Sequence, residues 1–322
     1  LYNMSLAYVK KICLFGGAGF IGSSIVRLLA KRGFELKIAT RSPFDEDLLE
    51  LKSTVSDPGQ ITIEKINIHS ASQIKNFIQD CEVCINLIGI LYEKGKNTFK
   101  KVHTDFVKNL VLATKEEKSI KHFIHFSSLG VKGDTESKYL ESKYQAEQTI
   151  KKYLKNYTII KPSIVYGGGQ KDFTNTFAKL IRLFPVIPLA GASVKFAPVY
   201  VGDIALGIEK IIDNEIKNET IEFVGNEIFN LTEIIKIISN EIRKKNIIIP
   251  IPSWLGKLQG AILGLAPNPM LTLDQVRTLE SGDNIATGNN RTLSDLEINL
   301  HGIRNIIPNY LWRFRKGGQF AK

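Results

Sequence analysis

The sequence predicts an α/β fold, with helices on both faces of a doubly wound parallel β-sheet and a smaller, mostly helical C-terminal cap. Three observations predict it. Strand-like and helix-like runs alternate through the first half of the 322 residues, a glycine-rich turn follows the first run, and the pattern loosens after Pro162. Such alternation is typical of parallel sheets covered on both faces.

The first half of the chain can be divided into strands and helices. Strands are expected where β-branched and aromatic residues cluster between turn residues, over residues 9–15, 35–40, 61–66, 83–91, 122–128 and 158–161. Helices are expected where apolar residues recur at helical spacing, over residues 21–31, 72–79, 102–118 and 139–154. The run 83–91 is almost continuously apolar, which is typical of a central strand buried on both faces.

The second half is less regular, because glycines at 167–169 and prolines at 185, 188 and 198 interrupt it. We expect it to add one or two strands to the sheet and otherwise to build the cap. An amphipathic helix is expected over 233–244, with Asn230 and Thr232 as capping candidates. We place the main domain over residues 8–165, with contributions from about 194–225, and the cap over residues 166–193 and 226–318.

Composition excludes several function classes. The longest apolar candidate, residues 254–265, contains Lys257 and is too short to span a bilayer. The net charge of +11 is spread over the chain, and no nucleic-acid-binding module is recognisable. Two interpretations of the charge stay open: an ordinary basic soluble protein, or attraction to an anionic membrane surface or acidic partner. Three cysteines fit a reducing compartment, and Cys81-x-x-Cys84 lacks a second ligand pair, so no metal site is expected.

A glycine-rich turn separates the first expected strand from the first expected helix. The pattern G-G-x-G-x-x-G is formed by Gly16, Gly17, Gly19 and Gly22. We expect Gly17 to allow the tight turn, Gly19 to let the backbone approach a pyrophosphate, and Gly22 to let the helix pack closely. The N–H groups that would then face the phosphates belong to Phe20, Ile21 and Gly22. This context is typical of a Rossmann-type dinucleotide-binding domain.

The end of the second expected strand predicts which dinucleotide binds. An acid about twenty residues after the glycines would bind the ribose 2′-hydroxyl of NAD. The chain has Thr40, Arg41 and Ser42 there instead. An arginine can pair with a 2′-phosphate and stack on adenine, and the neighbouring hydroxyls can donate hydrogen bonds. We therefore expect NADP(H) in preference to NAD(H); the alternative is that Arg41 is only a solvated loop residue.

The ends of the third and fourth expected strands supply further candidates for cofactor contacts. Asn67 ends the third strand, where a polar side chain could meet the adenine edge. Asn86, Leu87 and Gly89 end the fourth strand, beside the expected position of the ribose and nicotinamide. Gly89 would permit close approach of the backbone, or it simply ends the strand.

A candidate catalytic group follows the fifth expected strand. Ser127 and Ser128 end that strand, and Tyr139-x-x-x-Lys143 lies on the next helix. The i, i+4 spacing places Tyr139 and Lys143 on one face, where a cationic Lys143 is expected to lower the pKa of the phenol. Tyr139 would act as general acid or base for hydride transfer, with Ser128 holding a substrate carbonyl or hydroxyl. Lys143 is also expected to hydrogen-bond the nicotinamide ribose.

These motifs together resemble the short-chain dehydrogenase/reductase superfamily in its extended, epimerase-like form. The resemblance is carried by "GGAGFIG", "INLIGI", "HFSS", "YLESK", "KPSIVYG" and "FAPVYVGDIA" and covers nearly the whole chain. It implies a Rossmann fold, a nicotinamide dinucleotide and, if the chain is active, NAD(P)-dependent oxidoreductase or epimerase chemistry. It also implies that the cofactor site includes Ser127, Lys161, Pro162 and Ile164.

A narrower resemblance points to accessory subunit nine of the alpha subcomplex of respiratory complex I and its bacterial relatives. It is carried by "TRSP", "IPIPSWL", "PNPMLTLDQVRTLESGDN" and "LHGIRNIIPNYLWRFR". It implies a tightly held NADPH remote from electron transfer, complex I subunits as partners, and peripheral attachment on the matrix or cytoplasmic face of the inner membrane. Members often have a degraded active site, whereas Ser128, Tyr139 and Lys143 are all present here.

Three functions therefore stay open. The first is an NADP(H)-binding accessory or assembly protein of complex I, in which the cofactor stabilises the fold. The second is an active NADP-dependent reductase or epimerase that uses Ser128, Tyr139 and Lys143 on a small apolar or quinone-like substrate. The third is a nucleotide-sugar epimerase or dehydratase, which the apolar cap segment "SWLGKLQGAILGLAPNPML" disfavours unless that segment is simply core.

Overall fold

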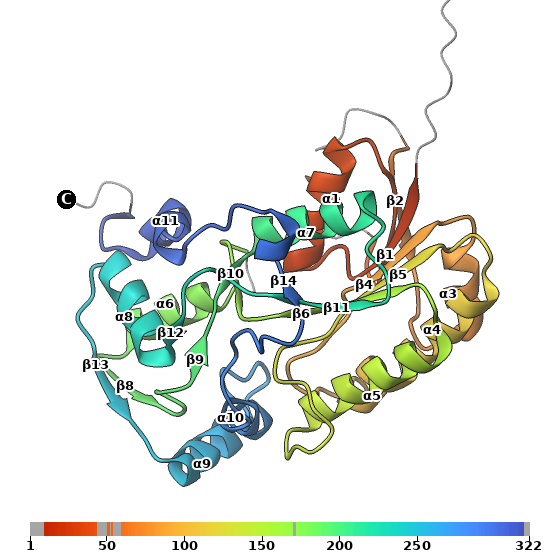
Figure 1. The fold of residues 1–322 in the computed structure, drawn as a ribbon. Coiled ribbons are helices and arrows are strands. Elements are labelled where there is room, and N and C mark those ends of the chain that lie inside the picture. Colours follow the sequence, from red (N-terminus) through yellow and green to blue (C-terminus); the bar gives the residue numbers. More distant parts are fainter. Residues whose placement is uncertain (1–9, 44–49, 52, 54–58, 170–171, 319–322) are drawn as a thin grey trace, which may run out of the picture.

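A computed structural model describes residues 10–43, 50, 51, 53, 59–169 and 172–318 of the chain. Its centre is a sheet of eight strands in the order β3-β2-β1-β4-β5-β6-β11-β14, and all neighbours run parallel (Figure 1). The strands are β1 (Lys11–Phe15), β2 (Glu35–Thr40), β3 (Ile61–Lys65), β4 (Val83–Asn86), β5 (His122–Phe126), β6 (Tyr157–Pro162), β11 (Glu219–Phe223) and β14 (Arg291–Thr292). The expected doubly wound parallel sheet is confirmed.

The strand order reverses beside β1. The chain runs outward from β1 to β2 and β3, and then returns to place β4 on the other side of β1. In open α/β sheets, ligands bind in the crevice at the carboxyl ends of the strands where the order reverses. This crevice lies between the carboxyl ends of β1 and β4.

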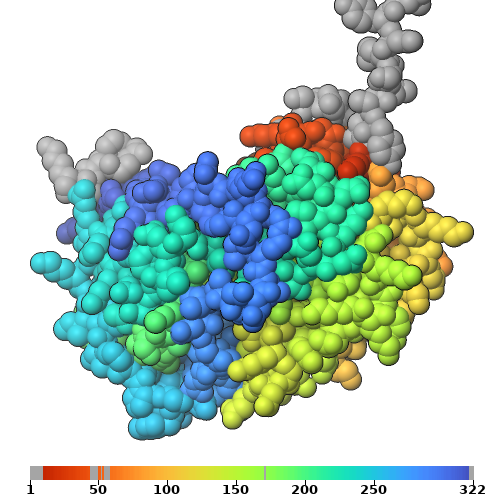
Figure 2. Space-filling model, viewed as in Figure 1, coloured from red at the N-terminus to blue at the C-terminus, as the bar shows by residue number. Residues whose placement is uncertain are grey.

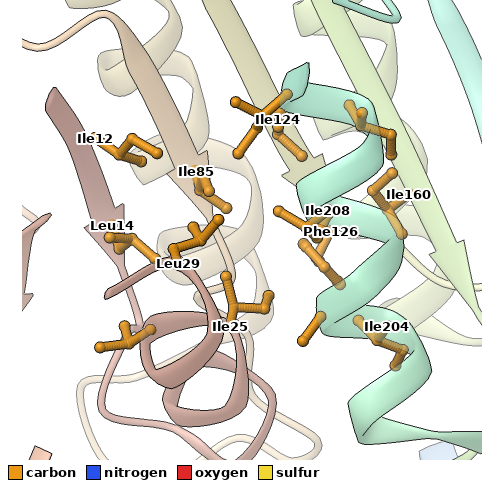
Figure 3. Close-up of a cluster of buried hydrophobic side chains, with 14 of the residues drawn as sticks. Ile12, Leu14, Ile25, Leu29, Ile85, Ile124, Phe126, Ile160, Ile204 and Ile208 are labelled. Carbon is orange, nitrogen blue, oxygen red and sulfur yellow. The ribbon is translucent and has the colours of Figure 1, made fainter. Parts of the chain in front are cut away.

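Helices cover both faces of the sheet. One face carries α1 (Phe20–Lys31) and α7 (Val201–Asp213), whose isoleucine and leucine side chains pack onto Ile85, Ile124 and Ile160 of the strands (Figure 3). The other face carries α3 (Ala71–Ile78), α4 (Phe106–Glu116) and α5 (Lys138–Tyr153). Each fully buried Ile or Leu contributes about 1.5–3 kcal/mol, so the two faces hold the main domain together.

Two elements differ from the sequence-based prediction. The expected strand 83–91 stops at Asn86, because the Asn86 side-chain oxygen accepts the N–H of Ile88 at 3.0 Å and turns the chain away. Leu91 is consequently 64% exposed rather than buried in a strand. The expected helix 102–118 begins earlier, with a π-helical turn over Lys100–Asp105 that leads into α4.

The cap has its own apolar core, away from the main sheet. Its helices are α6 (Phe173–Leu183), α8 (Leu231–Glu241), α9 (Ser253–Leu263), α10 (Leu273–Glu280), α11 (Ile303–Ile306) and α12 (Pro308–Leu311). The remaining strands form two-stranded sheets, two of which include a strand from residues 194–225. The pairs are β7 (Val165–Tyr166) with β10 (Val199–Tyr200), β8 (Val186–Leu189) with β13 (Ile247–Pro250), and β9 (Lys195–Phe196) with β12 (Phe229–Asn230). Asn230 caps α8, as expected, because its side chain accepts the Glu233 N–H at 2.9 Å.

The C-terminal segment returns from the cap to the main sheet. It runs across the front of the molecule as the blue surface in Figure 2. β14 lies within the range that the sequence analysis assigned to the cap, yet it pairs with β11. The buried carboxylate of Glu222 holds this segment, since it accepts hydrogen bonds from the Thr287 N–H at 2.7 Å and the Asn290 amide at 2.8 Å.

Candidate functional site

The glycine loop lies at the carboxyl end of β1, on the crevice. Its left-handed residue is Gly16, with φ +90°, whereas the sequence suggested that Gly17 would make the turn. A Cβ at Gly22 would overlap the Gly16 carbonyl oxygen and lie 2.7 Å from the Gly17 Cα, so only glycine lets α1 start this close to the loop. Gly19 is exposed and its own N–H donates to the Gly16 carbonyl at 3.0 Å.

The start of α1 is suited to an anion. Gly19 occupies the N-cap position and has no side chain to cap the helix, and no acid lies in the first turn. Phe20 and Ile21 are half-buried, and their N–H groups belong to the first turn, at the positive end of the helix dipole. This cradle fits the pyrophosphate of a dinucleotide.

The end of β2 lies beside the glycine loop. Phe15 pairs with Ala39, which brings Thr40 alongside Gly16. The Thr40 hydroxyl accepts the Ser42 N–H at 3.1 Å and donates to the Ser42 carbonyl at 3.2 Å, so it shapes the turn after the strand. Arg41 and Ser42 are exposed on this turn.

The chain after β4 joins the glycine loop to the Tyr139 region. A Cβ at Gly16 would lie 3.1 Å from the Leu87 carbonyl carbon, so the two loops are in contact. A Cβ at the exposed Gly89 would lie 3.4 Å from Lys143 Nζ and 3.6 Å from His103 Nε2. The backbone at Gly89 thus borders the space in front of Lys143.

The two predicted asparagines lie in different surroundings. Asn86 is 0% exposed, and its amide nitrogen lies 3.1 Å from His125 Nδ1, so its side chain faces the interior. Asn67 is exposed after β3, and its side-chain oxygen accepts the His69 N–H at 3.0 Å. Asn67 stands at the outer edge of the sheet, and both residues stay predictions as cofactor ligands.

Tyr139, Lys143 and Ser128 come together at the carboxyl end of β5. Tyr139 lies on the first turn of α5, near the Ser128 side chain, whose hydroxyl donates to the Leu129 carbonyl at 3.2 Å. The ring centres of Phe99 and His103 lie 5.8 and 5.5 Å from the centre of the Tyr139 ring. Lys143, one turn later, is 5% exposed and donates from Nζ to the Phe126 carbonyl at 2.9 Å. The short segment between Ser128 and Tyr139 therefore still allows the two side chains to meet.

The electrostatics of this group differ from the expectation. Burial raises the pKa of the Tyr139 phenol, and the hydrogen bond with Ser128 opposes this only in part, so the expected lowering by Lys143 is wrong for the chain without a cofactor. Lys143 turns its ammonium to the Phe126 carbonyl. Burial also lowers the pKa of Lys143 to about 8, against the opposite effect of the Glu147 carboxylate.

His103 is a site residue that the sequence did not single out. Its Nε2 accepts the Ile90 N–H at 3.0 Å, so Nδ1 carries the proton and donates to Ser142 Oγ at 2.8 Å. Ser142 in turn donates to the Tyr139 carbonyl at 2.8 Å. Burial, aided by the charge of Lys143, lowers the pKa of His103 to about 2, which keeps this ring neutral. No spacing signal could have found it, because its contacts with Ser142 and Tyr139 join segments that are far apart in the sequence.

A buried polar network lies beneath Lys143. The Ser127 hydroxyl donates to Glu147, and Lys161 Nζ forms an ion pair with the other Glu147 oxygen at 3.0 Å. Both Ser127 and Lys161 were expected at the cofactor, and in the structure their side chains meet Glu147. The carbonyls of Pro162 and Ile164 accept the N–H groups of Leu129 at 3.2 Å and Val199 at 2.9 Å. Cofactor contacts by these four residues stay predictions.

Two further observations concern the residues that the structure describes. Within them, no group of three or more His, Cys, Asp or Glu side chains is arranged to hold a metal ion. Among the described helices, none combines the length and apolar character needed to cross a membrane.

The fold and this site define a class of protein. A parallel sheet with this strand order and a glycine loop at the reversal of that order define a Rossmann-type dinucleotide-binding protein, and the Tyr–Lys pair on the helix after β5 agrees with the expected resemblance to extended short-chain dehydrogenase/reductases.

Comparison with known proteins narrows this class. The model of the NmrA-like family matches residues 9–262, and the chain belongs to that family. It is 28% identical over 317 residues to the mitochondrial NADH dehydrogenase (ubiquinone) 1 alpha subcomplex subunit 9 of Arabidopsis thaliana, across 95% of this chain and 78% of that protein. The Mus musculus protein of the same name is 30% identical over 282 residues, across 85% of this chain and 72% of that protein. The resemblance to subunit nine is thereby confirmed.

A solved structure shares the fold. The Citrobacter sp. triphenylmethane reductase complexed with NADP(H) matches with a TM-score of 0.72, at 15% identity, over 92% of this chain and 99% of that chain. At this identity the likeness extends to the architecture and no further.

Proposed function

We propose that this chain is an NADP(H)-binding accessory or assembly subunit of respiratory complex I, or of its bacterial relative. The similarity to subunit 9 along 95% of the chain carries the proposal. The dinucleotide role is supported by the glycine cradle, in which Gly22 leaves no room for a side chain between α1 and the loop. A ligand bound only by the native state adds about 2.7 kcal/mol of stability at 100 times its Kd, so a permanently held NADP(H) would strengthen the fold.

The choice of NADP(H) over NAD(H) rests on the turn after β2. Arg41 is exposed there, and the neighbouring Thr40 hydroxyl fixes the turn through the Ser42 backbone. A guanidinium at this place can pair with a 2′-phosphate, whereas the ribose 2′-hydroxyl of NAD(H) would need an acid.

Attachment to a larger assembly is supported by an exposed apolar row on α9. Trp254, Leu258 and Ile262 follow one another at single-turn spacing and are 68%, 50% and 60% exposed. Contiguous apolar surface of this kind marks contacts with protein or membrane. With the net charge of +11, it favours a peripheral position at the matrix or cytoplasmic side of an anionic inner membrane, next to complex I subunits.

A second candidate function is favoured by the intact Tyr139 group. In an active NADP-dependent reductase or epimerase, the nicotinamide would supply or accept the hydride. Ser128 would hold the substrate oxygen, Tyr139 would donate or accept a proton at that oxygen, and Lys143 would bind the nicotinamide ribose. The rings of Phe99 and His103 beside Tyr139 suit a small apolar or quinone-like substrate.

The nucleotide that co-purifies with the protein tests the first candidate. We expect NADPH to be released on denaturing protein prepared without added cofactor, and the native protein to migrate with complex I on native gels. Migration free of complex I in every membrane preparation would contradict the subunit assignment.

Turnover tests the second candidate. Oxidation of added NADPH by a quinone-like or ketone substrate, reduced on the order of 10²- to 10⁴-fold in Tyr139→Phe, would assign an activity. Bound NADPH that never turns over would leave the complex I subunit as the one remaining candidate. Turnover of UDP-sugars would instead indicate the nucleotide-sugar epimerase alternative.

A further inference from the structure

Helix α10 of the cap contacts the N-terminus of the helix that carries Tyr139 (Figure 1). One carboxylate oxygen of Asp274 accepts the Lys138 N–H at 2.7 Å. The other accepts the Tyr139 N–H at 3.1 Å and the Ser137 hydroxyl at 3.0 Å. The Asp274 carboxylate, which belongs to the cap, thus accepts hydrogen bonds from three donors at the start of α5.

The same face of α10 binds the segment that leads into α5. Thr278, one turn after Asp274, lies 2.8 Å from the Ser137 hydroxyl. The Ser281 carbonyl accepts a hydrogen bond from Lys132 Nζ at 3.1 Å. These contacts recur at helical spacing along α10 and fall on the residues between Ser128 and Tyr139, which are otherwise a loop.

The first turn of α5 consequently has two caps. Ser137 is the local N-cap, and its oxygen accepts the Leu140 N–H at 3.3 Å. Asp274 satisfies the two donors that precede Leu140, and its negative charge lies at the positive end of the helix dipole. Tyr139 stands on this turn, so the order of the turn fixes the direction in which its side chain leaves the helix.

We propose that Asp274 is the positioning residue for Tyr139, through which the cap sets the orientation of the phenol at the site. The inference deepens the reductase candidate, on which the chemical role of Tyr139 rests. Asp274 contacts backbone groups of α5 rather than the reacting atoms, and therefore acts through Tyr139.

The ionisation of Tyr139 tests this placement without any cofactor or substrate. Phenolate absorbance is measured at about pH 10, where an ordinary tyrosine is half ionised. It is measured in each variant and in the same variant carrying Tyr139→Phe, so that the difference reports Tyr139 alone. The wild-type phenol is expected to stay mostly protonated because its partial burial raises its pKa. In Asp274→Asn the phenol is expected to ionise more, because a frayed first turn exposes it further to water.

Two further variants separate positioning from other effects. Asp283→Asn is the matched control, because Asp283 also accepts a backbone N–H, that of Lys195 at 2.9 Å, without contacting α5. It is expected to leave Tyr139 protonated. Ser137→Ala keeps the Asp274 charge and removes the local cap, so it should raise Tyr139 ionisation by a smaller amount in the same direction.

The outcomes are distinct. A shift in Asp274→Asn and Ser137→Ala but not in Asp283→Asn supports the proposal. A shift in Asp274→Asn alone reflects the lost charge and overturns it, as does no shift in either variant. If Asp274→Asn does not fold, the ionisation of Tyr139 in Ser137→Ala decides: a rise supports the proposal, and no change overturns it. Because the assay needs neither NADP(H) nor turnover, its failure is separate from failure of the proposed function; where turnover is found, kcat should fall in Asp274→Asn while NADP(H) affinity is kept.

Discussion

The two ends of the candidate site are built in different ways. The cradle at the β1–α1 turn is formed by residues 16–22, and its shape depends on the backbone at Gly16 and the absence of a side chain at Gly22. The Tyr139 end is assembled from distant segments: Phe99 and His103, the end of β5, and α5 itself. One end is a local backbone shape, and the other is a cluster of buried polar side chains.

The two ends also differ in how strongly they reduce the stability of the cofactor-free protein. The cradle leaves backbone N–H groups available to a ligand at the helix start, which water can satisfy in the free protein. At the Tyr139 end, burial lowers the pKa of Lys143 to about 8 and that of His103 to about 2. Near neutral pH the buried ammonium of Lys143 destabilises the free protein, so its replacement should raise stability, whereas a side chain at the cradle should lower it.

The largest effect is expected at the cradle. Gly22→Ala places a Cβ into the Gly16 carbonyl and 2.7 Å from the Gly17 Cα, so α1 must move away. We expect loss of measurable NADP(H) binding by calorimetry and a stability loss of about 1–3 kcal/mol by denaturant unfolding.

Gly33→Ala is the control for this variant. Gly33 has φ +85° but no atom within 4 Å of an added Cβ, so it costs backbone strain alone and should keep binding. Equal loss of binding in both variants would contradict a steric role for Gly22.

The next effect concerns the network beneath Lys143. Glu147→Gln leaves Lys161, whose side chain is 15% exposed, without its ion-pair partner, which is expected to cost about 3 kcal/mol of unfolding free energy. Glu116→Gln is the matched control: it removes an exposed pair with Lys75 and should cost less than about 1 kcal/mol. Similar losses in the two variants would show that the Glu147 pair is not effectively buried.

Arg41→Asp tests the dinucleotide preference. Loss of a charged hydrogen bond to the 2′-phosphate is worth about 1.5–3 kcal/mol, so NADP(H) affinity should fall about 10- to 100-fold while NAD(H) affinity is kept or gained. Arg27→Asp, which breaks only the exposed pair with Glu50, serves as the charge control. An equal fall in affinity for both dinucleotides in Arg41→Asp would show that Arg41 does not contact the 2′-phosphate.

The smallest expected effect is a gain in stability rather than a loss. The pKa of Lys143 is lowered from 10.5 to about 8, so the buried ammonium costs up to about 3 kcal/mol below pH 8, and this cost disappears as pH rises toward 10.5. Lys143→Met should therefore stabilise the cofactor-free protein near neutral pH by about 2 kcal/mol, after losing the bond to the Phe126 carbonyl. The gain should shrink to nothing as pH rises; a loss of stability at pH 7 would contradict it.

The sequence predicts the local end of the site better than the assembled end. The glycine pattern, the amphipathic helices and the Tyr139–Lys143 spacing depend on neighbouring residues. The elements predicted from them are present in the structure, except that strand 83–91 ends at Asn86 and helix 102–118 begins with a turn at Lys100. His103, Glu147 and Asp274 could not be found in this way, because their roles arise only when the sheet and cap bring distant segments together. The wrong expectation for the Tyr139 pKa has the same origin, since spacing does not show how deeply a phenol is buried.

Calorimetric titration of nucleotide-free, folded protein with NADPH and with NADH tests the central claim most directly. The account predicts one site per chain that binds NADPH more tightly than NADH, through the backbone of the glycine loop and the guanidinium of Arg41. Absence of binding by both dinucleotides, in protein shown to be folded, would contradict it.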